Sequence, residues 1–216
     1  MNDNSSAAAQ RRIFVARHGS RLDVEDPAWA EQDPRPWDPP LAPRGRGQAR
    51  RLAARLADKG VDFIFSSPFL RALETAEPLA DILDLPLRVE PGLSEWLTPD
   101  WFPLPEPALR LDRLAKQFAR IDRSYTPRGT ACFGETGPEA LQRSAETARQ
   151  LTQDFSGNLA LFGHVASLLG VVSGLLDTDP EILKDDALAD PPPSCTAEIV
   201  LAGGTWHLQS IMNFFN

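Results

Sequence analysis

The feature that most constrains the fold is an apolar run over residues 13–16 that ends abruptly in Arg17, His18 and Gly19. Four consecutive apolar residues without alternation are typical of a strand covered on both faces, as in a parallel α/β sheet. Ligands of such sheets bind just beyond the carboxyl ends of the strands. An imidazole placed there, beside a guanidinium and before a glycine that admits a ligand to the backbone, suits attack on a phosphoryl group. The run therefore predicts an α/β sheet and the edge where its site lies.

The same pattern occurs twice more along the chain. Residues 61–65 predict a second strand, and residues 66–68, of sequence Ser-Ser-Pro, predict a helix cap with proline at the first helical position. Arg71 then falls in the first helical turn. Residues 159–162 predict another buried strand, which is followed by Gly163 and His164. Because the carboxyl ends of parallel strands meet at one edge of a sheet, we expect the polar residues after these strands to converge there.

The other elements complete an α/β arrangement. Apolar spacing predicts helices over residues 43–59, 139–153 and 165–176 and a short strand over 87–89. Two runs separated by Gly203-Gly204, at 197–201 and 205–211, predict a closing hairpin and hence an antiparallel strand on an otherwise parallel sheet.

Two long connections lie beside the predicted site. Residues 20–40 are polar and broken by prolines, and predict a loop that forms a wall of the site. Residues 97–137 predict a cap-like insertion. Its helix would carry one apolar stripe, formed by Leu111, Leu114, Phe118 and Ile121.

Length and composition favour a single α/β domain over residues 12–216 of the 216-residue chain. Residues 1–11 are small and polar, which predicts a mobile tail and no signal peptide. The most apolar helix candidate, 165–176, is too short to span a bilayer. These features predict a cytoplasmic protein with no membrane partner.

Charge and cysteine content exclude further classes. The formal net charge of −8 opposes binding to nucleic acid, because the long-range field repels polyanions. Cys132 and Cys195 are far apart and have no metal-ligand spacing. We expect two unrelated buried thiols in a reducing compartment, and neither a disulfide framework nor a zinc site.

Each candidate residue also has a structural explanation. Arg71 would serve as a solvated helix residue, His164 as a hydrogen-bonded core histidine, and His18 as a loop residue. Two of the three histidines nevertheless directly follow solid apolar strands, and this joint placement favours a site. His207 lies in the polar phase of the predicted hairpin, so we interpret it as structural.

These motifs resemble the histidine phosphatase superfamily, also called the phosphoglycerate mutase-like family, from about residue 12 to residue 211. The resemblance is carried by Arg17-His18-Gly19, Ser66-Ser67-Pro68 with Arg71 and Thr75-Ala76, Glu95, and Gly163-His164. It implies a three-layer α/β/α fold with a mostly parallel, mixed sheet. It also implies that His18 is the phosphorylated nucleophile and that Arg17, Arg71 and His164 complete the phosphate pocket.

Three further stretches are similar to one branch of the superfamily, which contains the suppressor of T-cell receptor signalling phosphatases and the ecdysteroid-phosphate phosphatases. They are Arg21, residues 89–93 leading into Glu95-Trp96, and Ile121-Asp122 followed by Tyr125 and Pro127. Only the catalytic domain is similar, so the biology of the signalling proteins is not carried over. The resemblance also allows a homodimer.

Charge indicates how such a pocket would work. A phosphate monoester carries nearly two negative charges, which guanidiniums neutralise with matching forked geometry. We expect neutral His18 to attack in line while Arg17 and Arg71 hold the equatorial oxygens. Arg21 would add a contact, and a cationic His164 would stabilise charge in the transition state.

Glu95 is the predicted general acid and base. It would protonate the leaving oxygen and later accept a proton from the water that cleaves the phosphohistidine. A surface carboxylate is the alternative interpretation of Glu95. The scheme requires neither a metal nor a cofactor.

The predicted function is that of a phosphomonoesterase acting on a phosphorylated small molecule or a phosphoprotein. A phosphoglycerate-type mutase is the nearest alternative, although residues 96–99, Trp-Leu-Thr-Pro, lack the Arg-His-Tyr-Gly type of stretch found in those mutases. A catalytically silent module that binds a phosphorylated partner is the alternative from another class. Several aromatic residues near the site would suit a bulky or aryl phosphate, or equally well packing: Trp29, Trp37, Trp101, Phe102 and Tyr125.

Overall fold

The core of the fold is a mixed sheet of six strands. The structure, a computed structural model, describes residues 10–104, 107–183, 188 and 190–213. Its strands are β1 (Arg12–Arg17), β2 (Val61–Ser66), β3 (Leu87–Val89), β4 (Asn158–Gly163), β5 (Thr196–Ala202) and β6 (Thr205–Met212). They are ordered β3-β2-β4-β1-β5-β6, with β5 antiparallel to both of its neighbours and the other pairs parallel. This confirms the predicted sheet with one antiparallel strand.

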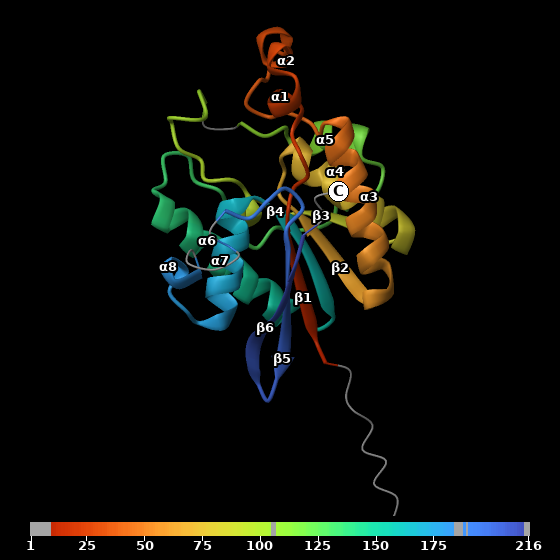
Figure 1. Cartoon of the computed structure of the whole chain (residues 1–216), viewed down its shortest axis with the longest axis vertical. Helices are drawn as coiled ribbons and strands as arrows, with labels where there is room; N and C mark the ends of the chain where they lie inside the picture. Colours follow the sequence, from red (N-terminus) through yellow and green to blue (C-terminus); the bar gives the residue numbers. More distant parts are fainter. Residues whose placement is uncertain (1–9, 105–106, 184–187, 189, 214–216) are drawn as a thin grey trace, which may run out of the picture.

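Helices cover both faces of the sheet and form the outer layers (Figure 1). Helices α3 (Pro43–Leu56) and α4 (Leu70–Leu83) lie on one face, and α6 (Gly137–Asp154) and α7 (Val165–Leu176) lie on the other. Alternation along β1 supplies both cores. Phe14 and Ala16 pack with α3 and α4, whereas Ile13 and Val15 pack with α6 and α7, and all four are at most 1% exposed. Each large apolar side chain buried in this way stabilises the fold by about 1.5–3 kcal/mol.

Two connections differ from the predicted structure. The stretch predicted as a loop contains two short helices, α1 (Leu22–Glu25) and α2 (Pro27–Gln32), which project beyond the carboxyl ends of the strands (Figure 1). In the predicted insertion, α5 (Leu111–Gln117) ends before Phe118, and Ile121 instead forms a bridge with Leu87 of β3. Three short helices complete the described elements: η1 (Ala57–Lys59), η2 (Pro91–Leu93) and α8 (Pro180–Leu183).

Helix α4 begins later than predicted and takes its cap from a distant loop. Its first residue is Leu70, and Phe69 at the N-cap provides no side-chain cap. The buried carboxylate of Asp38 accepts a hydrogen bond from the Leu70 N–H at 2.9 Å and so caps the helix. This contact joins the loop before α3 to the helix that carries Arg71.

The N-terminal segment and the cysteines correct two smaller expectations. Arg11, placed in the predicted tail, donates hydrogen bonds to the carbonyls of Gly157 (3.1 Å) and Thr152 (2.8 Å), so the anchored chain includes it. Residues 1–9 of that tail lie outside the described residues. Cys195 is buried as expected, but Cys132 is exposed. Within the described ranges, every helix is too short or too polar to cross a membrane.

A buried carboxylate anchors residues 125–129 to the body of the protein. Glu90 is 0% exposed and accepts hydrogen bonds from the N–H groups of Gly92 and Gly129 (2.9 Å each), the N–H of Arg128 (2.8 Å) and the hydroxyl of Tyr125 (2.6 Å). These four donors offset the cost of burying the charge. The backbones approach so closely that a Cβ on Gly129 would lie 2.7 Å from the Gly92 Cα. A Cβ on Gly92 would lie 2.1 Å from Thr147 Oγ1, so both positions favour glycine.

We expect Glu90→Gln to destabilise the protein by about 2–4 kcal/mol, because an amide replaces an acceptor oxygen with a donor that faces N–H groups. Urea unfolding would measure the difference. Glu31→Gln, at an exposed position, is the matched control and should change the free energy of unfolding by less than about 0.5 kcal/mol. Equal stability of the two variants would contradict the role given to Glu90.

Candidate active site

The predicted site residues meet at the carboxyl edge of the sheet. They come from the ends of β1 and β4, the first turn of α4 and the loop after η2, and they are Arg17, His18, Arg71, Glu95 and His164. One side-chain N or O atom from each of His18, Glu95 and His164 lies within 4.8 Å of the others. The two imidazole centroids are 5.3 Å apart. The strand ends thus bring together residues separated by about 150 positions in the sequence.

His18 has the protonation state of a nucleophile. Its Nδ1–H donates to the Gly19 carbonyl at 2.8 Å, which leaves the lone pair on Nε2. Burial, and then the charges of Arg71, Arg17 and Arg21, lower the pKa of His18 well below 6.5, although the bond to Gly19 opposes the shift. The ring is therefore neutral at physiological pH.

The backbone of His18 is fixed on both sides. Its N–H donates to the Gly163 carbonyl at 2.9 Å, and its carbonyl accepts from the Ser194 N–H at 3.0 Å. Ser194 lies in the left-handed region with φ of 63°. The end of β4 and the turn before β5 therefore set the position of His18.

Arg71 is a buried cation whose donors are only partly used. Its side chain is 2% exposed, with Nη2 3.8 Å from Glu95 Oε2 and Nη1 3.8 Å from Asp38 Oδ1. The guanidinium carbon lies 4.6 Å from the centre of the Phe69 ring. Burial lowers the pKa of Arg71 to about 10, while Glu95 and Asp38 oppose this, so it stays charged at neutral pH. Among the described residues, its Nε and Nη1 have no hydrogen-bond partner, and such donors suit the oxygens of an anion.

The other two arginines are held by neighbouring groups. Arg17 Nη1 donates to the Pro191 carbonyl, and burial lowers the pKa of Arg17. Arg21 forms a two-point contact with Asp23, at 3.0 Å from Nε and 2.6 Å from Nη2. A contact between Arg21 and phosphate stays a prediction, because this guanidinium already pairs with a carboxylate.

His164 is buried between Ser67 and Glu95. Its Nε2 lies 2.8 Å from Ser67 Oγ, and its Nδ1 lies 3.5 Å from Glu95 Oε2. Burial, and then the charges of Arg71 and other cationic groups nearby, lower the pKa of His164 well below 6.5. The protein's own groups thus favour a neutral imidazole, which corrects the cationic state expected from the sequence. The negative charge of a bound phosphate dianion would raise the pKa of His164.

Glu95 faces the site with one of its two oxygens. Oε1 accepts from the Trp96 N–H at 3.0 Å, and Oε2 is the atom closest to Arg71 and His164. The side chain is 14% exposed. Its carboxylate therefore lies beside Arg71 and His164, close to His18, instead of on the open surface.

The contacts of several supporting residues were not predicted from the sequence, although Thr75 lies in one of the motifs that carry the resemblance. Thr75 Oγ1 accepts from the Gly19 N–H at 3.1 Å and its hydroxyl donates to the Arg71 carbonyl at 2.7 Å, which links two motifs. Gln48 Oε1 accepts from the Ser20 N–H at 2.8 Å. Their partners are distant in sequence, so spacing gives no signal. Asp38 follows a tryptophan and precedes two prolines, and no periodicity marks it as buried.

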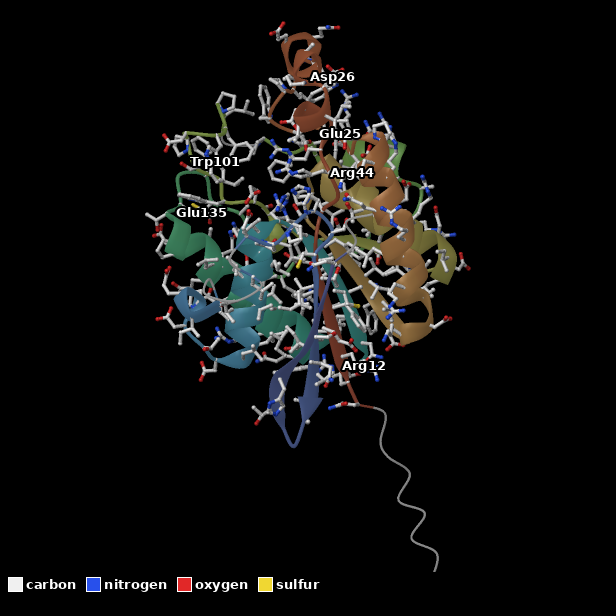
Figure 2. The ribbon with its side chains drawn as sticks, in the orientation of Figure 1. Arg12, Glu25, Asp26, Arg44, Trp101 and Glu135 are labelled. Atoms are coloured by element: carbon white, nitrogen blue, oxygen red, sulfur yellow. The ribbon has the colours of Figure 1, made fainter. Side chains whose placement is uncertain are left out.

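Most of the aromatic residues near the site take part in packing. Trp37, Phe69, Leu97 and Phe102 form an apolar cluster, and Trp37 Nε1 donates to the Pro107 carbonyl at 3.0 Å. Trp101 is 56% exposed and lies on the same side of the molecule as the buried Glu135 (Figure 2). Of the two explanations left open for these aromatic residues, packing accounts for Trp37 and Phe102.

The chain matches the histidine phosphatase superfamily (branch 1) over residues 13–213 and therefore belongs to this superfamily. In its fold it is similar to the ecdysone phosphate phosphatase of Bombyx mori solved with tungstate. That structure has a TM-score of 0.76 and 23% identity, over 93% of this chain and 92% of the other. The expected phosphoglycerate mutase-like fold is confirmed.

The curated relatives are larger proteins. The chain is 36% identical to the transcription factor tau 55 kDa subunit of Saccharomyces cerevisiae, over 61% of this chain and 32% of that protein. It is 25% identical to the ecdysteroid-phosphate phosphatase of Drosophila melanogaster, over 76% and 27% respectively. It is 29% identical to the mouse ubiquitin-associated and SH3 domain-containing protein A, over 93% and 39%. The chain thus spans about a third of these relatives, which include the branch expected from the motifs.

We expect the free energy of unfolding to fall as the pH drops below 6.5. The pKa values of His18 and His164 are lowered in the folded state, so the unfolded chain binds more protons from pH 6.5 down to the folded pKa values. The loss is up to about 1.4 kcal/mol per pH unit for each histidine. Urea unfolding between pH 7.5 and 5.5 should show a smaller loss for His164→Gln than for wild type. His207→Gln, at an exposed position, should follow wild type, and parallel curves for all three proteins would contradict the argument.

Proposed function

We propose that the protein is a phosphomonoesterase that works through a phosphohistidine on His18. The observation that carries this proposal is the neutral His18, beside the buried Arg71 and within 4.8 Å of Glu95 and His164. The Nε2 lone pair attacks phosphorus while Arg71, Arg17 and Arg21 stabilise the negative charge of the phosphoryl oxygens. As the bond from phosphorus to the ester oxygen breaks, Glu95 delivers a proton to that oxygen.

The second half of the cycle reverses the role of Glu95. Its carboxylate takes a proton from a water molecule as this water attacks phosphorus and breaks the bond to Nε2. Inorganic phosphate leaves, and His18 returns to the tautomer that Gly19 stabilises. Every proton transfer in this scheme takes place between Glu95 and either the leaving oxygen or the attacking water, so we propose a metal-independent reaction.

A phospho-ligand binding module is the second candidate. The observation in its favour is the 36% identity to a protein named as a subunit of a transcription factor. The same buried arginines would hold a phosphorylated partner without turnover. Binding of inorganic phosphate, together with no phosphohistidine on rapid quench, would favour this module over the enzyme.

We expect p-nitrophenyl phosphate to be hydrolysed in excess chelator, and His18→Ala to abolish the activity because the covalent pathway is lost. Release of p-nitrophenol measures the rate, and mass spectrometry of the quenched enzyme detects the phosphohistidine. His207→Ala, on the exposed edge of the hairpin, should retain wild-type turnover. Activity that survives in His18→Ala, or that is lost with the metal, would contradict the proposal.

Glu95→Gln should distinguish substrates by leaving group. An alkyl phosphate needs a proton on its leaving oxygen, so we expect a loss of about 100- to 10,000-fold in rate. The p-nitrophenolate ion leaves without a proton, so the loss there should be much smaller. The two rates are compared as kcat/KM on both substrates, and equal losses would contradict the general-acid role.

A further inference from the structure

A buried ion pair between Arg143 of α6 and Glu135, which precedes that helix, lies next to the loop that carries Glu95. Arg143 and Glu135 make a two-point contact, with Nη2 to Oε1 at 2.6 Å and Nε to Oε2 at 2.9 Å. Their side chains are 9% and 4% exposed. The proposed reaction does not use either residue. Removing two charges from water is costly, so a net gain in folding stability does not by itself explain why the pair is buried here.

The remaining donors of Arg143 hold the backbone on one side of Glu95. Nη1 donates to the carbonyls of Gly92 (2.8 Å) and Ser94 (3.3 Å). Nη2 donates to the carbonyl of Glu95 itself at 3.1 Å. A single guanidinium therefore fixes three carbonyl groups that lead up to the proposed acid.

Glu135 holds the backbone on the other side of Glu95. Its Oε1 accepts from the Leu97 N–H at 3.2 Å, and its own carbonyl accepts from the Trp96 indole at 2.7 Å. The Gly134 N–H also donates to the Leu97 carbonyl at 2.8 Å. The segment 94–97 has no helix or strand of its own, so these contacts replace the regular hydrogen bonds that it lacks.

We propose that Arg143, held by Glu135, is a positioning residue that sets the place of the Glu95 carboxylate relative to His18. This inference rests on the proposed function, because it assigns Arg143 a role only if Glu95 transfers protons. The Glu95 carboxylate lies 3.5 Å from His164 Nδ1 and 3.8 Å from Arg71 Nη2. A shift of about 1 Å in the loop would therefore take the carboxylate out of hydrogen-bond distance of the leaving oxygen. Misplacement of that size costs about 100-fold in rate.

The test uses Arg143→Met, which keeps the length and apolar stem of the side chain and removes the donors. We expect kcat/KM, which reports the phosphorylation step and not the later attack by water, to fall by about 10- to 100-fold on an alkyl phosphate and by less than about 3-fold on p-nitrophenyl phosphate. Arg149→Met, at an exposed position of the same helix, is the matched control and should keep both rates. Equal losses on the two substrates would overturn the proposal, because a general loss of structure affects both alike.

A double-mutant cycle separates positioning from a purely structural role. In the Glu95→Gln background, Arg143→Met should cost less than about 2-fold on the alkyl phosphate, because the group that it positions no longer transfers a proton. A loss as large as in the wild-type background would overturn the proposal. If Arg143→Met does not fold, Glu135→Gln replaces it in the comparison of substrates and in the double-mutant cycle. This substitution weakens the ion pair with Arg143 and keeps an acceptor for the Leu97 N–H.

The outcomes distinguish this inference from the function on which it rests. If Glu95→Gln fails to discriminate between the two leaving groups, the general-acid assignment falls, and the positioning role falls with it. If Glu95→Gln discriminates and Arg143→Met and Glu135→Gln do not, only the positioning role is overturned.

Discussion

The positive charge of an almost fully buried guanidinium must be compensated by nearby groups. For Arg71 these groups come from three parts of the chain. Asp38 comes from the loop before α3, Glu95 from the loop after η2, and Phe69 from the residue that precedes α4. Each of these contacts also fixes a part of the site. The same burial that lowers the pKa of Arg71 also favours the neutral form of His18, so one buried site holds both a cation and an uncharged imidazole.

The parts of the site that could be predicted from sequence are those that follow regular elements. His18 and His164 directly follow buried strands, and Arg71 lies in the first turn of a helix, so periodicity and topology were enough to bring them together. The protonation state of a buried histidine was harder to predict, because it depends on both burial and the charges nearby. His164 was expected to be a cation, yet its buried position between Arg71 and His18 favours the neutral ring.

Contacts between segments distant in sequence gave no local signal. Asp38 caps α4 in place of the predicted serine, and Ser67 is paired with His164 instead. The stretch over 20–40 contains two short helices because a single helical turn needs neither an apolar stripe nor a strong cap. The exposure of Cys132 similarly depends on how the insertion folds over α6, which composition does not report.

The attachment at Glu90 has a consequence for how this insertion can vary. Three of its four hydrogen bonds come from backbone N–H groups, those of Gly92, Arg128 and Gly129. Backbone donors of this kind depend on the path of the chain and not on the identity of the side chains. Among the donors to Glu90, only Tyr125 contributes a side chain. Within residues 125–129, positions other than Tyr125 and Gly129 can therefore change their side chains without loss of these hydrogen bonds to Glu90. The sequence of this segment is thus weakly constrained, whereas the path of its backbone over the body of the protein is fixed.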